Sequence, residues 1–169
     1  MRKIIRNKKG FLLASEVLKI VLAVISITFL IYLLFSIYYA NINAQKKEEA
    51  ESTLKRIGDI ITRINNGAIM REMMNDITPV SWSFFSFVES EKKPNLCAGE
   101  DCMCICDSVN FDNFLFWSDR QINECDGNGI CLTVKNLNKF ESFKIKSADD
   151  GGTNIEVSKD GKSIEVKEA

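Results

Sequence analysis

The sequence contains no histidine. This excludes nucleophiles activated by a Ser-His or Cys-His pair. The acidic pairs Glu100-Asp101 and Asp149-Asp150 stand in expected turns, where such side chains are usually solvated. The glycines of DGNG (126–129) and DGGTN (150–154) suit turns, and neither segment opens a helix after a strand as a phosphate-binding loop does. We therefore expect no catalytic residue, no cofactor and no enzyme activity, and keep a Ca²⁺ site at Asp126 or Asp149-Asp150 as the weaker alternative.

Charge is missing from residues 20–40, IVLAVISITFLIYLLFSIYYA. Twenty-one residues in a helix cover about 30 Å, the thickness of the hydrocarbon layer of a bilayer. A single segment satisfies its backbone in lipid only as a helix, so we expect one membrane-spanning helix with the lipid bilayer as a partner. A buried core helix would be shorter. A cleaved secretory signal would have a shorter apolar run and a small-residue cleavage site, and the match at residues 40–44 is poor.

Acidic residues are missing from residues 1–10, which carry five basic ones, whereas residues 41–169 contain 16 Lys and Arg against 22 Asp and Glu. The positive-inside rule predicts a cytoplasmic N-terminus and an extracytoplasmic C-terminal domain. An acidic exterior argues against nucleic acid as a partner. The sequence therefore predicts a single-pass protein of the cell membrane.

Cysteine is missing from the first 96 residues, and all six cysteines lie in the expected outer domain. An even number in a small extracytoplasmic domain indicates disulfides, whereas the spacing fits neither zinc knuckles nor common iron–sulfur motifs, so we expect no metal. Cys125 and Cys131 could pair with each other, or each could bridge to the 102–106 strand. The predicted disulfide cysteines are Cys97, Cys102, Cys104, Cys106, Cys125 and Cys131.

Helix breakers are scarce before residue 67, where Asn65-Asn66-Gly67 forms a stop signal. Apolar residues recur at heptad-like spacing in the second half of this helix, which predicts a packing stripe. These stripe residues are Ala50, Leu54, Ile57, Ile61 and Ile64. We expect a basic leader (1–10), a transmembrane helix (11–40), an extracytoplasmic amphipathic helix (41–67) and an antiparallel β domain (68–169). The fold class is α+β.

Alternating residues and turn signals predict the elements of the β domain. We expect a short helix or helical turn over residues 68–76, an aromatic strand or loop over 111–117, a tight turn over 126–129, and one antiparallel sheet against the helix stripe. Strands are predicted over residues 80–88, 102–107, 130–135, 143–146, 153–158 and 162–168.

Two faces are predicted for the strand over residues 80–88. Phe85 and Phe87 lie on the face opposite to the other large apolar residues, and they cover either a subunit contact or a second buried face. The residues predicted to share the first face are Val80, Trp82, Phe84 and Val88.

The N-terminal region carries a family signal. Residues 8–12 read KKGFL, Ser15-Glu16 follow, and the long apolar helix comes next. This pattern resembles the class III leader of type IV pilins and archaeal pilin-like proteins. The resemblance implies cleavage by a prepilin peptidase between Gly10 and Phe11, and an acid, here Glu16, that contacts the N-terminal amine of a neighbouring subunit. Glu16 is the sixth residue counted from Phe11, where the family often has its acid fifth.

The resemblance implies a pilin-like structural subunit of a surface filament or pseudopilus, with prepilin peptidase and copies of itself or other pilin-like subunits as partners. The chain is also generally similar to uncharacterised single-span archaeal membrane proteins. The alternative is an unprocessed envelope protein with an extracytoplasmic binding domain. In that case Glu16 and Lys19 form an i,i+3 pair at the cytoplasmic interface, because residues 20–40 already span the bilayer.

Overall fold

The computed structural model describes the backbone of residues 8–107 and 117–169, and the side chains of residues 16–107 and 121–169. It divides into two compact units, Met1–Ile42 and Asn43–Ala169, each described by itself below. The helix α1 (Lys8–Asn65) contributes to both units, and its described part includes residues 8–10 of the predicted leader. The fold class is α+β, as predicted: a long apolar helix followed by antiparallel sheets with three disulfides.

In the first unit, α1 is long and apolar enough from Glu16 onward to cross a membrane. Its large apolar side chains are exposed on every side, from Leu33 at 38 % to Tyr32 at 71 %. The hydroxyl of Ser26 donates to the carbonyl of Leu22 at 2.8 Å, and that of Thr28 donates to the carbonyl of Val24 at 2.5 Å. These two hydroxyl groups therefore have hydrogen-bond partners within the helix.

In the second unit, the predicted stripe of α1 is buried, together with Thr53 and Ile60. The helix ends where the sequence predicts, because Gly67 adopts a φ of 74° that favours glycine. The N–H of Gly67 donates to the carbonyl of Ile64, and the N–H of Ala68 donates to that of Arg63, each at 3.0 Å. This pair of bonds is a Schellman motif, which satisfies carbonyls that the helix end would leave without partners.

The expected single sheet is wrong, because the strands form two sheets. The first has the antiparallel order β1-β6-β7, and contains β1 (Arg71–Met74), β6 (Ile155–Asp160) and β7 (Ser163–Glu168). The predicted helix over residues 68–76 is therefore also wrong. Pairing with β6 and burial of Met74 override the helix propensity of this segment.

The second sheet has the antiparallel order β4-β3-β2-β5. Its strands are β2 (Ser83–Phe87), β3 (Cys102–Cys106), β4 (Ile130–Thr133) and β5 (Phe143–Lys144). Val80 precedes β2 and is 37 % exposed, whereas Trp82, Phe84 and Val88 are buried, so the prediction that Val80 shares their face is wrong. The alternation is interrupted at Ser81, whose φ is 76°.

A second helix, α2 (Trp117–Asn128), replaces the tight turn predicted over residues 126–129. Gln121, Ile122 and Cys125 are buried, and their i, i+1, i+4 spacing places them on one helical face. The aromatic strand or loop predicted over residues 111–117 lies outside the described residues, except that Trp117 begins α2.

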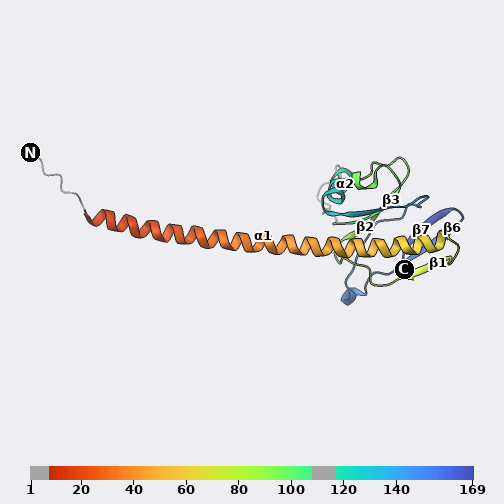
Figure 1. The fold of residues 1–169 in the computed structure, drawn as a ribbon, viewed down its shortest axis with the longest axis horizontal. Helices are drawn as coiled ribbons and strands as arrows, with labels where there is room; N and C mark the ends of the chain where they lie inside the picture. Colours follow the sequence, from red (N-terminus) through yellow and green to blue (C-terminus); the bar gives the residue numbers. More distant parts are fainter. Residues whose placement is uncertain (1–7, 108–116) are drawn as a thin grey trace, which may run out of the picture. The chain divides into compact units, whose positions relative to one another are not determined.

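The main hydrophobic core forms where the stripe of α1 meets both sheets. Ile57 of α1, Val157 of β6 and Phe84 of β2 belong to the same buried cluster. Figure 1 shows the last turns of α1 beside the strands of the second unit. Since each sheet has only three or four short strands, the helix supplies the apolar surface that stabilises both.

Candidate functional site

A second, smaller core covers the other face of the four-stranded sheet. In β2, Phe84 faces α1, while Phe85 and Phe87 face this second core. Phe85 is 6 % exposed and Phe87 is 9 % exposed, so of the two predicted alternatives the structure has a second buried face. The period-two alternation of β3 likewise places its cysteines in this core and Met103 and Ile105 in the main one.

Three disulfides cross-link the residues of this second core. Cys97 pairs with Cys102, Cys104 pairs with Cys131, and Cys106 pairs with Cys125. The sequence left open whether Cys125 and Cys131 pair with each other or each bond to the 102–106 strand. In the structure each of them forms a disulfide with a cysteine of β3. The disulfides thereby attach the helix α2, the strand β4 and the loop before β3 to this one strand.

Four of the sulfur atoms gather at one end of β3. The Sγ atom of Cys104 lies 3.7 Å from that of Cys97 and 3.9 Å from that of Cys102. The sulfurs of Cys97, Cys104 and Cys131 all lie within 4.8 Å of one another. Such a group has the spacing of metal ligands, but here every sulfur is part of a disulfide, and a metal ligand must be a thiolate.

The side-chain amide of Gln121 lies beside the third disulfide. Its Nε2 atom is 3.5 Å from the sulfurs of Cys106 and Cys125, and it donates to the carbonyl of Asp107 at 2.9 Å. Gln121 is 2 % exposed, so this buried polar group has its hydrogen-bonding requirement met. The sequence prediction missed Gln121 together with α2; its i,i+4 spacing from Cys125 was the available signal.

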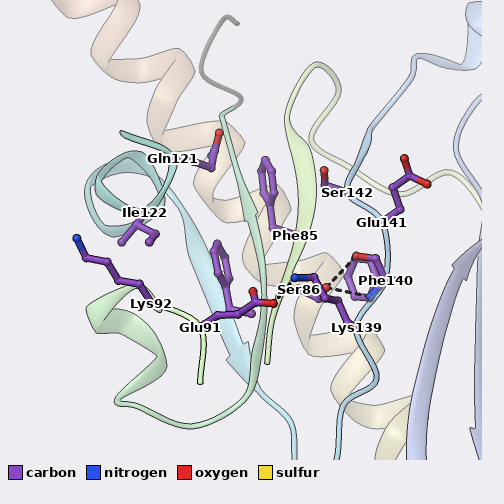
Figure 2. A pocket seen from close by; sticks show the side chains of 11 residues that line it. Phe85, Ser86, Glu91, Lys92, Gln121, Ile122, Lys139, Phe140, Glu141 and Ser142 are labelled. Carbon is purple, nitrogen blue, oxygen red and sulfur yellow. Dashed lines mark hydrogen bonds and ion pairs between the residues drawn. The ribbon is translucent and has the colours of Figure 1, made fainter. Parts of the chain in front are cut away.

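A cavity of about 630 Å³ opens beside the second core, between β2, α2 and the segment before β5. Its apolar part includes Phe85, Ile122 and Phe140, and an ion pair joins Lys139 and Glu91 near it. Figure 2 shows these side chains and the two hydrogen bonds of 3.0 Å between the Ser86 hydroxyl and the backbone of Phe140. The lining of the cavity therefore contains apolar side chains, with charged side chains at its edge.

The loop between β2 and β3 is held by one carboxylate. Asp101 Oδ1 accepts a hydrogen bond of 2.8 Å from Lys93 Nζ and one of 2.9 Å from the backbone N–H of Glu89. Glu89 has a φ of 56°, a conformation that side chains other than glycine seldom adopt, and this bond helps to stabilise it. The bond from Lys93 holds the pKa of Asp101 below its usual value, although partial burial acts in the opposite direction.

Two carboxylates of the weaker calcium alternative, Asp126 and Asp150, have hydrogen-bond partners within the protein. Asp126 accepts hydrogen bonds from the Asn95 side chain at 2.7 Å and from the Leu96 backbone at 3.2 Å. Asp150 accepts a bond of 2.9 Å from Ser147 Oγ. These contacts account for the two carboxylates as structural parts of a loop and a turn.

The residues of the predicted processing and assembly site all lie on α1. Gly10 and Phe11 belong to the first turns of this helix, and only their backbone is described. Glu16 is exposed on the same helix. Cleavage and subunit contact at these positions remain predictions.

Comparison of the chain with models of known protein families, with curated proteins and with solved structures finds no match.

Proposed function

We propose that the protein is a non-enzymatic, pilin-like structural subunit of a cell-surface filament or pseudopilus, anchored in the membrane by α1. The observation that carries this proposal is the division of α1 itself. Its apolar segment is exposed on all sides, whereas its last turns are buried in a disulfide-bonded β domain. Such a layout is consistent with a pilin-like subunit, in which lipid or neighbouring helices cover the apolar segment.

Glu16 supports a role in assembly. A carboxylate within an apolar helix bundle needs a partner, because leaving it unpaired in lipid is costly. Cleavage after Gly10 would create an ammonium group at Phe11, and the same group on a neighbouring copy supplies the opposite charge. The proposed partners are therefore the lipid bilayer, a prepilin peptidase, and copies of this chain or other pilin-like subunits.

The six cysteines support an extracytoplasmic place for the β domain. All six form disulfides, and such bonds persist in oxidising compartments. The basic residues before α1 favour a cytoplasmic N-terminus. The proposed topology is single-pass, with the N-terminus in the cytoplasm and the β domain outside.

One observation favours a second candidate, an unprocessed single-span envelope protein with a binding domain. Residues 20–40 contain no charge and are long enough to span the bilayer alone. Glu16 and Lys19 then stay at the cytoplasmic interface, and no cleavage is needed.

N-terminal sequencing of the protein purified from membranes separates these two candidates. The proposal expects a mature chain that starts at Phe11, and a retained Met1 leader contradicts it. In the variant Gly10→Val we expect the leader to be retained, because a branched side chain replaces the glycine at the cleavage site.

Glu16→Gln serves as the matched variant, because it removes the charge and leaves residues 8–11 unchanged. We expect cleavage to continue and the amount of protein in the sheared surface fraction to fall. If both variants reach that fraction as wild type does, the chain is not assembled through this site.

A further inference from the structure

Two of the three disulfides lie in contact with each other. Cys104 Sγ is 3.7 Å from Cys97 Sγ, and the Cys97–Cys102 and Cys104–Cys131 bonds are therefore neighbours in one buried cluster. This separation is about the sum of two sulfur radii, so no side chain or water stands between them. Thiol–disulfide exchange requires contact between a thiolate and a disulfide sulfur, with the thiolate in line with the bond that breaks. Cys104 Sγ lies beside the Cys97–Cys102 bond, 3.7 Å from one sulfur and 3.9 Å from the other, so its side chain must rotate after it is released from Cys131.

Access to the cluster is uneven. Five of the six cysteines are fully buried at 0 % exposure, and Cys131 alone is partly exposed. It lies on β4, an edge strand of the four-stranded sheet. Cys131 is therefore the most exposed residue of the cluster, while both cysteines of the Cys97–Cys102 bond are shielded.

We propose that Cys97, Cys102, Cys104 and Cys131 form a thiol–disulfide exchange site, in which an external dithiol reduces the Cys104–Cys131 bond at Cys131 and the released Cys104 exchanges with the buried Cys97–Cys102 bond, leaving Cys102 and Cys131 as thiols. The reductant is a protein or small-molecule dithiol, of which one molecule is oxidised per chain. The exchange is stoichiometric and involves no enzymatic turnover, and it does not depend on whether the chain is a filament subunit, because it uses only groups within the β domain.

The first half of the reaction occurs at the exposed bond. A thiolate of the dithiol attacks Cys131 Sγ, forms a mixed disulfide, and releases Cys104 as a thiolate. The second thiol of the dithiol then attacks its own mixed-disulfide sulfur, so that Cys131 leaves as a thiolate and the dithiol departs as a disulfide.

The second half occurs inside the cluster. The Cys104 thiolate attacks Cys97 Sγ, a Cys97–Cys104 bond forms, and the Cys97–Cys102 bond breaks. The electron pair leaves on Cys102. Two electrons and two protons from the dithiol have then been transferred to Cys102 and Cys131, which end as thiols.

Met103 makes this exchange measurable, because it separates the two pairs in the sequence. Cyanogen bromide cleaves after methionine, and the methionines are residues 1, 70, 73, 74 and 103. In the native pairing no disulfide crosses Met103, so fragments 75–103 and 104–169 separate without reduction. After exchange the Cys97–Cys104 bond joins these two fragments. The strongly acidic cleavage keeps thiols protonated and prevents further exchange.

The test treats the full chain in detergent with limiting dithiothreitol, quenches with acid, blocks thiols with N-ethylmaleimide, and cleaves with cyanogen bromide. We expect joined fragments 75–103 and 104–169, with Cys102 and Cys131 blocked. Opening of any bond with the two fragments still separate overturns the proposal. Labelling of Cys106 and Cys125 before the other four cysteines also overturns the proposal.

Two variants test the exchange without added reductant. Cys131→Ser leaves Cys104 as a thiol beside an intact Cys97–Cys102 bond, and we expect joined fragments without any reductant. Cys125→Ser is the matched control, since it leaves Cys106 as a thiol beside the Gln121 amide, and we expect separate fragments. Joined fragments in both variants indicate unspecific exchange and overturn the proposal. If Cys131→Ser fails to fold, the wild-type measurement alone decides.

Discussion

Gly129 and Cys106 approach each other so closely that a Cβ atom on Gly129 would lie 2.7 Å from the Cβ atom of Cys106. The same atom would lie 2.7 Å from the carbonyl oxygen of Cys125, the disulfide partner of Cys106. Gly129 also donates its N–H to that oxygen at 2.9 Å. The close approach of α2 to β3 therefore depends on the missing side chain at this position.

We expect Gly129→Ala to lower the free energy of unfolding by about 1–3 kcal/mol, because the methyl group displaces backbone or the Cys106–Cys125 bond. Gly127→Ala is the matched control, since no atom lies within 4 Å of its Cβ position and it belongs to α2. Its effect should be neutral or stabilising by less than about 1 kcal/mol. Thermal unfolding of the full chain in detergent measures both. Equal effects would show that the space at Gly129 is unimportant.

The disulfides should differ in their contribution to stability. In the chain-entropy description, the loop closed by Cys106–Cys125, with a sequence separation of 19, contributes about 3 kcal/mol. Cys97–Cys102 closes a separation of 5 and contributes about 2 kcal/mol. We therefore expect the double alanine variant at Cys106 and Cys125 to unfold at a lower temperature than the one at Cys97 and Cys102. All four residues are fully buried, so the cavities left by the changes are comparable. If the two double variants unfold in the reverse order, either the disulfide pairing or the dependence of stability on loop length is wrong.

Asp101 should give a pH-dependent contribution to stability. Its hydrogen bond from Lys93 lowers the pKa in the folded state below the value of about 3.9 for unfolded chains. The ionised carboxylate therefore stabilises the fold above that pH, and the contribution is lost as the pH falls through the lower folded-state value.

Unfolding by urea as a function of pH tests this expectation in the wild type and in Asp101→Asn. The asparagine retains an oxygen for the Glu89 N–H but loses the charge facing Lys93. The difference between the two proteins should be largest above about pH 5 and should shrink at lower pH. A difference that stays constant over this range would show that the charge has no role.

The apolar segment of α1 should insert less completely when a charge is placed near its centre. Leu30 lies in the middle of residues 20–40 and is 59 % exposed. We expect Leu30→Arg to disfavour insertion by about 2.5–3.5 kcal/mol, and Leu30→Ala to have a much smaller effect. Extraction of membranes with alkaline carbonate measures the outcome. Full retention of the arginine variant would argue against a spanning helix.

The patterns that the sequence analysis interpreted correctly are local. The heptad-like stripe from Ala50 to Ile64 is buried, Gly67 ends the helix, and the cysteines of 102–106 share one face of a strand. Each of these depends on the geometry of one element, which its own residues specify.

The predictions were wrong where contacts with a distant segment of the chain decide the local structure. Residues 68–76 have helix-forming residues, but β6 offers Arg71–Met74 a pairing partner that lies about 80 residues away. Residues 126–129 contain turn-forming glycines, yet residues 126–128 complete a helix whose buried face is fixed by the Cys106–Cys125 bond. The free-energy differences that underlie local helix propensity are too small to decide which structure such a segment adopts.

The sequence alone determined the apolar helix and its uncharged run, the α+β class, and the presence of disulfides, because these follow from hydrophobic periodicity, length and composition. Only the tertiary structure decided that the strands form two sheets, that Cys125 and Cys131 each bond to β3, and that two disulfides touch. The spacing of the cysteines along the chain permits several pairings. Which sulfurs meet is set by the packing of α2 and β4 against β3, and that packing depends on contacts between residues far apart in the sequence.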